Sequence, residues 1–419
     1  METSFSTSFV FDDALNEEAK ICVIGVGGGG GNAVNNMIEK GIGGVDFWAI
    51  NTDSQALSAN LAPNKIQVGS LLTKGLGTGA QPSVGAEAIE ENRADIENAL
   101  QGFDMVFITA GMGGGTGTGG VPIVAQIAKE LGILSVAIVT KPFECEGKRR
   151  MAVSNRGIER LKEEIDTLII IPNERLLDLS EATTTLVEAF EKADEVLYNA
   201  TRGISDLITV HGLINLDFAD VRTTMTNGGT ALMGASTASG ENRAERAATE
   251  ALSSPLLDGV SIQGAKNVLV NITAGKSLGI REATTATGIV QKEAGDDVEV
   301  IFGTVIDNSM AGDLRITVIA TGFDTQKKLD GAARRKSLPL HADIPIAGYK
   351  GEENLKQLDI PAYRRRLATV STEPVDGGKG EESESNQGVR RLHSEEIQSS
   401  ERILKGDTDV PAFLRKMMD

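Results

Sequence analysis

Two glycine-rich segments, 25–31 and 111–120, constrain the fold of this chain more than any other feature. Each follows a short, wholly apolar run, at 21–24 and 105–108, of the kind that forms a parallel strand buried on both faces. Each is followed by residues with helical spacing. Because glycine has no Cβ atom, successive N–H groups can crowd around an anion at the positive end of a helix. The pattern predicts two phosphate-binding loops at one edge of a sheet.

The first segment, taken alone, leaves the ligand open. It fits G-x-G-x-x-G between a strand and a helix, and Asp53 follows the second predicted strand where a dinucleotide-binding fold places its ribose-binding acid. An NAD-dependent oxidoreductase is therefore one alternative. The second segment favours a ligand with several phosphates gripped from two sides, because a pyrophosphate needs only one such loop. The chain contains no G-x-x-x-x-G-K-[ST] motif, so no P-loop lysine is available.

The hydrophobic pattern predicts an α/β protein. Further buried strands at 45–50, 136–139 and 168–171 favour a doubly wound parallel sheet. A long amphipathic segment predicts a central helix, and the strand-like runs after it, at 267–272, 298–305 and 314–320, predict a second, smaller mixed α+β domain. The polar composition of both ends predicts disorder there. The expected parts are 1–18 (tail), 19–183 (sheet domain), 184–212 (central helix), 213–324 (second domain), 325–407 (linker) and 408–419 (terminal peptide).

Composition argues against several classes of protein. A net charge of −18 and an aromatic content of 4% disfavour nucleic acid as a partner. With two cysteines, Cys22 and Cys145, and three histidines, the sequence offers neither a disulfide framework nor a structural zinc site. It shows no signal-peptide pattern and no apolar run long enough to span a bilayer. We therefore expect a cytoplasmic protein.

The second glycine segment reads GGGTGTG at 113–119 and resembles the signature of the tubulin/FtsZ family. Residues 28–32 resemble the first phosphate loop of that family, and 215–220 (NLDFAD) resemble its catalytic loop. The closing peptide, 409–416, resembles the tail of bacterial members. The resemblance runs from about residue 20 to residue 324 and resumes only at this peptide, so it covers about three quarters of the chain.

The resemblance implies a GTP-binding domain and a chain that hydrolyses GTP while polymerising head-to-tail into the filaments of a bacterial division ring at mid-cell. It implies Mg²⁺ as the accompanying ion, held by phosphates and water rather than by protein ligands. A GTP-binding structural polymer with little hydrolysis is a second alternative. The nucleotide-binding residues that the resemblance implies are Gly28, Gly29, Gly30, Gly31, Asn32, Asn51, Asp53, Gly115, Thr116, Gly117, Thr118, Glu146, Arg150, Phe190 and Asp194.

The residues expected around the base and ribose have suitable chemistry. The carboxylate of Asp194 can accept two hydrogen bonds from guanine, whereas adenine would leave it badly paired. Phe190, one turn earlier, can stack on the base. Without the family, Phe190 is equally an ordinary core residue and Asp194 a solvated one. The assignment of Glu146 and Arg150 to the ribose and nucleotide oxygens rests on the resemblance.

The resemblance assigns catalysis to Asn215, Asp217 and Asp220. Two carboxylates three residues apart share a face at a helix start, which suits a Mg²⁺ ion or a water placed for attack on a polyphosphate. The alternative is that the first aspartate only caps a structural helix. The family further implies that this loop acts on the nucleotide of the neighbouring subunit. Hydrolysis would then require a head-to-tail contact.

The closing peptide from Asp409 to Lys416 places Val410, Phe413 and Leu414 on one side of a short helix, which is the pattern of a ligand for a partner's groove. The resemblance implies membrane tethers and division regulators as partners, without insertion of this chain into the membrane. A partial copy from Leu358 to Tyr363 lacks the following leucine. Whether this copy functions stays open.

Overall fold

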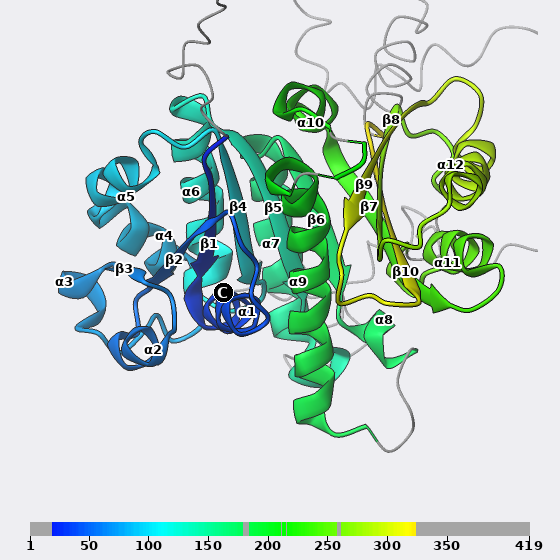
Figure 1. Cartoon of the computed structure of the whole chain (residues 1–419). Coiled ribbons are helices and arrows are strands. Elements are labelled where there is room, and N and C mark those ends of the chain that lie inside the picture. The colour runs from blue at the N-terminus through cyan, green and yellow to red at the C-terminus, as the bar shows by residue number, and fades with distance from the viewer. Residues whose placement is uncertain (1–18, 179–183, 211, 215, 258–260, 324–419) are drawn as a thin grey trace, which may run out of the picture. The chain divides into compact units, whose positions relative to one another are not determined.

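The computed structural model describes residues 19–178, 184–210, 212–214, 216–257 and 261–323 (Figure 1). The expected tail, linker and terminal peptide, with both tail motifs, lie outside the described residues, as does Asn215. The strands are β1 (Ile21–Val26), β2 (Asp46–Asn51), β3 (Asn64–Gln67), β4 (Met105–Gly111), β5 (Leu134–Lys141), β6 (Thr167–Pro172), β7 (Gly229–Ser239), β8 (Asn267–Ala274), β9 (Glu299–Ile306) and β10 (Asp313–Thr321).

The α-helices are α1 (Gly27–Glu39), α2 (Ser54–Ala59), α3 (Ser70–Thr73), α4 (Pro82–Glu91), α5 (Arg93–Leu100), α6 (Thr116–Glu130), α7 (Lys148–Glu164), α8 (Glu174–Leu177), α9 (Leu186–Thr209), α10 (Phe218–Met225), α11 (Arg243–Leu252) and α12 (Ile280–Ala294). The described residues also contain the 3₁₀ turns η2 (Glu144–Glu146) and η3 (Pro255–Leu257).

One sheet runs through the structure in the order β3-β2-β1-β4-β5-β6-β7-β10-β8-β9. Its strands are parallel from β3 to β7, and the expected parallel α/β sheet is confirmed. β10 is antiparallel to both of its neighbours, whereas β8 and β9 pair in parallel. The strand order reverses between β1 and β4. Ligands of such sheets bind beyond the carboxyl ends of the strands at this point.

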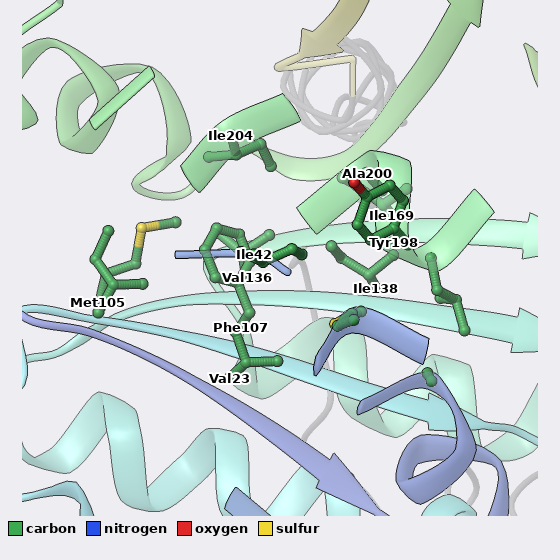
Figure 2. Close-up of a cluster of buried hydrophobic side chains, with 14 of the residues drawn as sticks. Val23, Ile42, Met105, Phe107, Val136, Ile138, Ile169, Tyr198, Ala200 and Ile204 are labelled. Atoms are coloured by element: carbon green, nitrogen blue, oxygen red, sulfur yellow. The ribbon is translucent and has the colours of Figure 1, made fainter. Parts of the chain in front are cut away.

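Two apolar cores cover the two faces of the parallel sheet. Along β1 the side chains alternate, so Ile21 and Val23 enter one core and Cys22 and Ile24 enter the other. Figure 2 shows the first core, in which Val23 of β1 and Phe107 of β4 lie beneath side chains of α9 such as Ile204. Helices α4, α6 and α7 supply the second core. The sheet is therefore buried on both sides.

The predicted central helix is α9, which has 24 residues and is about 36 Å long. It begins at a capping box in which the Thr185 hydroxyl accepts from the Glu188 N–H and the Glu188 carboxylate accepts from the Thr185 N–H. In Figure 1 it stands between the parallel part of the sheet and β8–β10. No helix among the described residues is both long and apolar enough to cross a membrane.

The first glycine segment is mostly helix rather than loop. The sequence predicts a helix from Asn32, but α1 begins at Gly27, so five successive glycines form its first turns. A Cβ at Gly30 would overlap the Thr109 carbonyl, and one at Gly29 would lie 3.0 Å from the Gly111 nitrogen. The absence of side chains lets α1 approach the end of β4 backbone to backbone.

The second half of the described chain contains β7–β10, α11 and α12, with a third core between the two helices and β8 and β10. β7 joins it to the first half. It pairs with β6 through three residues, Gly229–Ala231, and with β10 through eight. The sequence analysis predicts strands close to β8, β9 and β10 but none at β7. Its small residues and glycines hide the alternation of a strand.

We predict opposite effects of alanine at two helical glycines. Gly288 in α12 is exposed and its missing Cβ meets nothing, so Gly288→Ala should stabilise the fold by about 1 kcal/mol. A Cβ at Gly203 in α9 would lie 2.9 Å from Thr317 Cγ2, so Gly203→Ala should cost about 1–3 kcal/mol. Chemical denaturation measures both.

The matched test of the second effect adds Thr317→Ser, which removes the methyl group that the new Cβ meets. In a double-mutant cycle the cost of Gly203→Ala should shrink in the serine background. An unchanged cost would show that helix geometry, and not this contact, requires the glycine.

Candidate functional site

A cavity of about 380 Å³ opens at the switch point between β1 and β4. It brings together many of the predicted nucleotide-binding residues from α1, α6, α7, α9 and η2. Those that line it are Gly28, Gly29, Asn32, Gly115, Thr116, Gly117, Glu146, Arg150, Phe190 and Asp194. Gly28 and Asp194, 166 positions apart in the sequence, thus share one site.

The floor of the cavity is made by the amino termini of two helices. Gly28 and Gly29 belong to the first turn of α1, and Thr116 and Gly117 to the first turn of α6. The two turns touch, because a Cβ at Gly27 would lie 3.0 Å from the Gly117 nitrogen. Helix amino termini carry unpaired N–H groups and partial positive charge. The floor is thus suited to a phosphate chain.

Threonine hydroxyls hold the second glycine segment in place. The Thr116 hydroxyl lies 2.7 Å from that of Thr52, and both are buried. Thr118 Oγ1 accepts from the Gly113 N–H at 2.8 Å and is also buried. A Cβ at Gly115 would overlap the Thr78 hydroxyl. Thr118 therefore shapes the loop from behind and does not line the cavity.

The other predicted binding residues lie behind the cavity wall. Gly30 and Gly31 are buried in α1. Asp53 Oδ1 caps α2 by accepting from the N–H groups of residues 55 and 56 at 2.9 and 3.1 Å, and Asn51 Oδ1 accepts from the Asp53 N–H. Asp53, the acid on which the oxidoreductase alternative depends, thus uses one carboxylate oxygen to cap a helix. Its direct contact with a nucleotide stays a prediction.

The base end of the cavity lies against α9. Phe190 is 41% exposed and packs edge-on against Phe143, with ring centroids 5.2 Å apart. Burial and the nearby Glu191 raise the pKa of Asp194 to about 6, and the positive charge of Lys40 opposes them. Across the cavity, the carboxylate of Glu146 accepts from Arg150 and from the Phe143 N–H. These groups surround a space with an apolar face and a carboxylate.

Thr140 and Asn173 are among the nine cavity-lining residues that the sequence analysis did not name as binding residues. Asn173 is 4% exposed, and its Oδ1 has no hydrogen-bond partner. A buried unpaired amide oxygen in a cavity wall is typical of a group that waits for a ligand. Both residues stand at or just after the carboxyl end of a strand, β5 and β6. Their position after predicted buried strands could have identified them as site residues, because ligands of such sheets bind beyond the carboxyl ends of the strands.

The predicted catalytic carboxylates lie elsewhere. Asp217 is the N-cap of α10, and its Oδ1 accepts from the Asp220 N–H at 2.8 Å. Both residues are exposed, and neither lines the cavity. The capping role considered for Asp217 is therefore real and leaves one carboxylate oxygen and all of the Asp220 carboxylate available. Within the described residues, no three potential ligand side chains are gathered around a metal site.

We predict a pH-dependent contribution of Asp194 to stability. Its pKa is raised in the folded protein from 3.8 to about 6, so its contribution to folding is full below the lower value and is lost as pH rises through the higher one. Between these values, the wild type should lose stability relative to Asp194→Asn. Thermal unfolding at a series of pH values measures this difference.

Glu188 provides a control of opposite sign. Hydrogen bonds to Thr185 lower the pKa of its carboxyl, so its contribution is full above the unfolded-state pKa and is lost as pH falls through the folded one. The difference in the free energy of unfolding between wild type and Glu188→Gln should therefore become smaller as the pH falls. Parallel stability curves for Asp194→Asn and wild type would contradict the first prediction.

Comparison with known proteins agrees with this arrangement. The family model for the GTPase domain of the Tubulin/FtsZ family matches residues 20–181, and the model for the C-terminal domain of the FtsZ family matches residues 229–324. The first match contains both glycine segments, and the second contains β7–β10.

Solved structures give the same result. The chain is 44% identical to FtsZ of M. jannaschii, solved as an empty dimer, with a TM-score of 0.71 over 74% of this chain and 90% of that one. CetZ1 from Haloferax volcanii, a GDP-bound monomer, has a TM-score of 0.63 over 76% of this chain and 99% of that one. At 20% identity this second likeness shows the fold alone.

The domain models, the sequence identity and the fold agree from the first strand to the last. The model for the GTPase domain covers the helix amino termini that floor the cavity, and α9 lies between the two matched ranges. The chain therefore belongs to the FtsZ family, whose first domain is the GTPase domain shared with tubulin.

Proposed function

We propose that this chain binds GTP in the 380 Å³ cavity and hydrolyses it at sites that two copies complete in a head-to-tail filament. The observation that carries the proposal is a separation within one chain. The binding residues line the cavity, whereas the carboxylates expected to act on a nucleotide, Asp217 and Asp220, do not. A second copy that presents its α10 to the cavity would supply them, and the same contact repeated would build an open filament.

The cavity fits the parts of GTP in a definite order. The phosphates would lie on the amino termini of α1 and α6, where the glycines leave the N–H groups accessible. Glu146 and Arg150 would contact the ribose side, and Phe190 and Asp194 the base. The ionised Asp194 has two acceptor oxygens for the N1–H and amino group of guanine. Asn173, with its unpaired amide oxygen, would add a further polar contact.

Hydrolysis would then proceed by attack of water on the terminal phosphorus. The bond between that phosphorus and the bridging oxygen breaks, and GDP and inorganic phosphate form. The carboxylates on the neighbouring copy's α10 would orient the water and accept its hydrogen bonds. Mg²⁺, held by phosphate oxygens and water, would supply charge neutralisation when it is bound.

Exposed leucines support assembly at the two parts that must meet. Leu71 and Leu76, 83% and 82% exposed, lie close in sequence to Thr78 of the cavity wall. Leu213, 71% exposed, lies just before α10. Apolar side chains exposed to this degree are typical of surfaces that associate. The M. jannaschii protein was solved as an FtsZ dimer, which is consistent with self-association.

Membership of the FtsZ family supports the cellular role that we propose. We place the filament in the bacterial division ring, at mid-cell in the cytoplasm, with Asp409–Lys416 docking to membrane tethers and division regulators. The partial copy at Leu358–Tyr363 is a second candidate for such docking. Imaging of a fluorescent fusion, with and without residues 408–419, would test this role: a ring that persists without the peptide would exclude it as the tether.

We predict that GTP turnover depends on protein concentration. Because one chain lacks the carboxylates at its own cavity, turnover per molecule should be very low in dilute protein and rise together with light scattering above a threshold. ATP should give neither signal. Turnover per molecule that is independent of concentration would mean a site complete in one chain. Scattering without turnover would favour the GTP-binding structural polymer.

Two inactive variants should restore activity to each other. Asp194→Ala impairs base binding and Asp220→Ala removes a carboxylate from the facing surface, so each variant alone should be nearly inactive. In an equal mixture that assembles at random, about a quarter of the contacts join an intact cavity to an intact α10. Turnover should recover to about that fraction, with sedimentation verifying that both variants enter the polymer. Co-assembly without recovery would contradict a shared site.

A further inference from the structure

A second and larger cavity, of about 870 Å³, adjoins the base end of the nucleotide cavity. It lies between α1 and the amino-terminal half of α9, and Asn32 and Asp194 line both cavities. The family comparison assigns nothing to its other residues. Two of them carry positive charge, Lys40 at the end of α1 and Lys192 on α9.

Lys40 is held in a defined place. It is the C-cap of α1, and its N–H donates to the Asn36 carbonyl at 3.0 Å. Its Nζ lies 3.6 Å from Glu195 Oε1 and 4.9 Å from the centroid of the Tyr198 ring. An ammonium group over an aromatic face is attracted by the electron density of the ring. The Lys40 side chain is 37% exposed and that of Glu195 55%, so the ion pair alone is weak, and the aromatic contact adds to it in holding the ammonium group beside α9.

The Tyr198 ring is itself fixed. It is 6% exposed, and its hydroxyl accepts from Arg202 Nη1 at 2.8 Å. Arg202 is bound in turn by Asp206 and by Asp307, which follows β9. The Tyr198 ring beneath Lys40 is thus linked through its hydroxyl and Arg202 to Asp307 in the second half of the described chain, and these bonds restrain its orientation.

Asp194 stands four residues before Tyr198 on the same face of α9. Its side chain therefore lies one helical turn from the Tyr198 ring, over which the Lys40 ammonium group lies. Burial and Glu191 oppose ionisation of this carboxyl and Lys40 favours it, which leaves its pKa at about 6. Lys40 lines the same cavity as Asp194, and its positive charge favours the ionised form of this carboxyl.

The charge of Asp194 decides which base it can pair with. An ionised carboxylate offers two acceptors, which match the two donors of guanine. A protonated carboxyl offers one donor and one acceptor, which match N1 and the amino group of adenine. A change in protonation would therefore weaken selection for guanine as well as affinity for it.

We infer that Lys40 is a specificity-determining positioning residue: fixed over Tyr198, it keeps Asp194 ionised and so makes the site select guanine. This inference rests on the proposed function, in which Asp194 contacts the base. Lys40 acts through Asp194 and needs no contact with the nucleotide.

Other charges surround Asp194, and the test must separate them from Lys40. On α9 they are Glu188, Glu191, Lys192 and Glu195, and α1 adds Glu39. Across the nucleotide cavity, Glu146 and Arg150 pair with each other. α8 also packs against α9, and its Arg175 pairs with Asp178. Lys192 is the matched control, because it carries the same charge in the same cavity and acts on Glu188.

The experiment measures GTP and ATP affinity of the full chain by calorimetry, below the assembly threshold, from pH 6 to pH 8.5. In Lys40→Gln the loss of GTP affinity on acidification should begin at higher pH. A rise of one unit in the pKa of Asp194 would lower GTP affinity about threefold at pH 6.5 and leave it unchanged at pH 8.5. The ratio of GTP to ATP affinity should fall in parallel. Lys40→Arg should restore both, and Lys192→Gln should change neither.

A double variant excludes a merely structural effect. In an Asp194→Asn background, Lys40→Gln should have no further effect on the pH profile, because no carboxyl remains to respond. An identical pH profile in Lys40→Gln and wild type would overturn the inference, as would an equal shift in the Asp194→Asn background. Wild type that binds GTP no better than ATP would instead refute the proposed function, so the two failures are distinguishable.

Discussion

The structure depends on one close approach, that of the glycine-rich start of α1 to the ends of β4 and α6. At Gly30 and Gly29 the helix lies against the backbone of β4, and at Gly27 it lies against Gly117. Any side chain here would push α1 outward. The helix would then lose its place over the first core, and the floor that joins two helix amino termini would open. The phosphate site and the packing of the first core thus have the same requirement.

The second organising element is α9, which belongs to three parts of the molecule at once. Its amino-terminal half supplies Phe190 and Asp194 to the cavity, and its middle packs on the first core through Ala200. Further along, the Gly203 carbonyl accepts from Asn271 Nδ2 at 2.9 Å, and Arg202 pairs with Asp307. The helix that we propose to contact the base is therefore bonded to the second half of the sheet through a backbone carbonyl and an ion pair.

Much of this could be predicted from the sequence. Continuous apolar runs located β1 and β4, helical spacing located α9, and two glycine segments after strands located the cavity. Other features depend on tertiary contacts that no local pattern contains. The early start of α1 is favoured by packing on β4 and not by helix propensity, which disfavours glycine. β7 is stabilised by its neighbours on both sides. The sequence analysis named Asp53, which caps α2, and did not name Asn173, whose unpaired amide lines the cavity. The two roles depend on the surrounding structure, which the local sequence does not contain.

The uneven pairing of β7 has a mechanical consequence. Three residue pairs join it to β6, whereas eight join it to β10, so the continuous sheet has a narrow seam near its middle. In the filament that we propose, a tensile load that passes from one half of a subunit to the other would cross this seam or pass through α9. The seam would yield first, while the α9 contacts still hold the two halves together. Each subunit would then behave as two stiff plates joined by a compliant hinge.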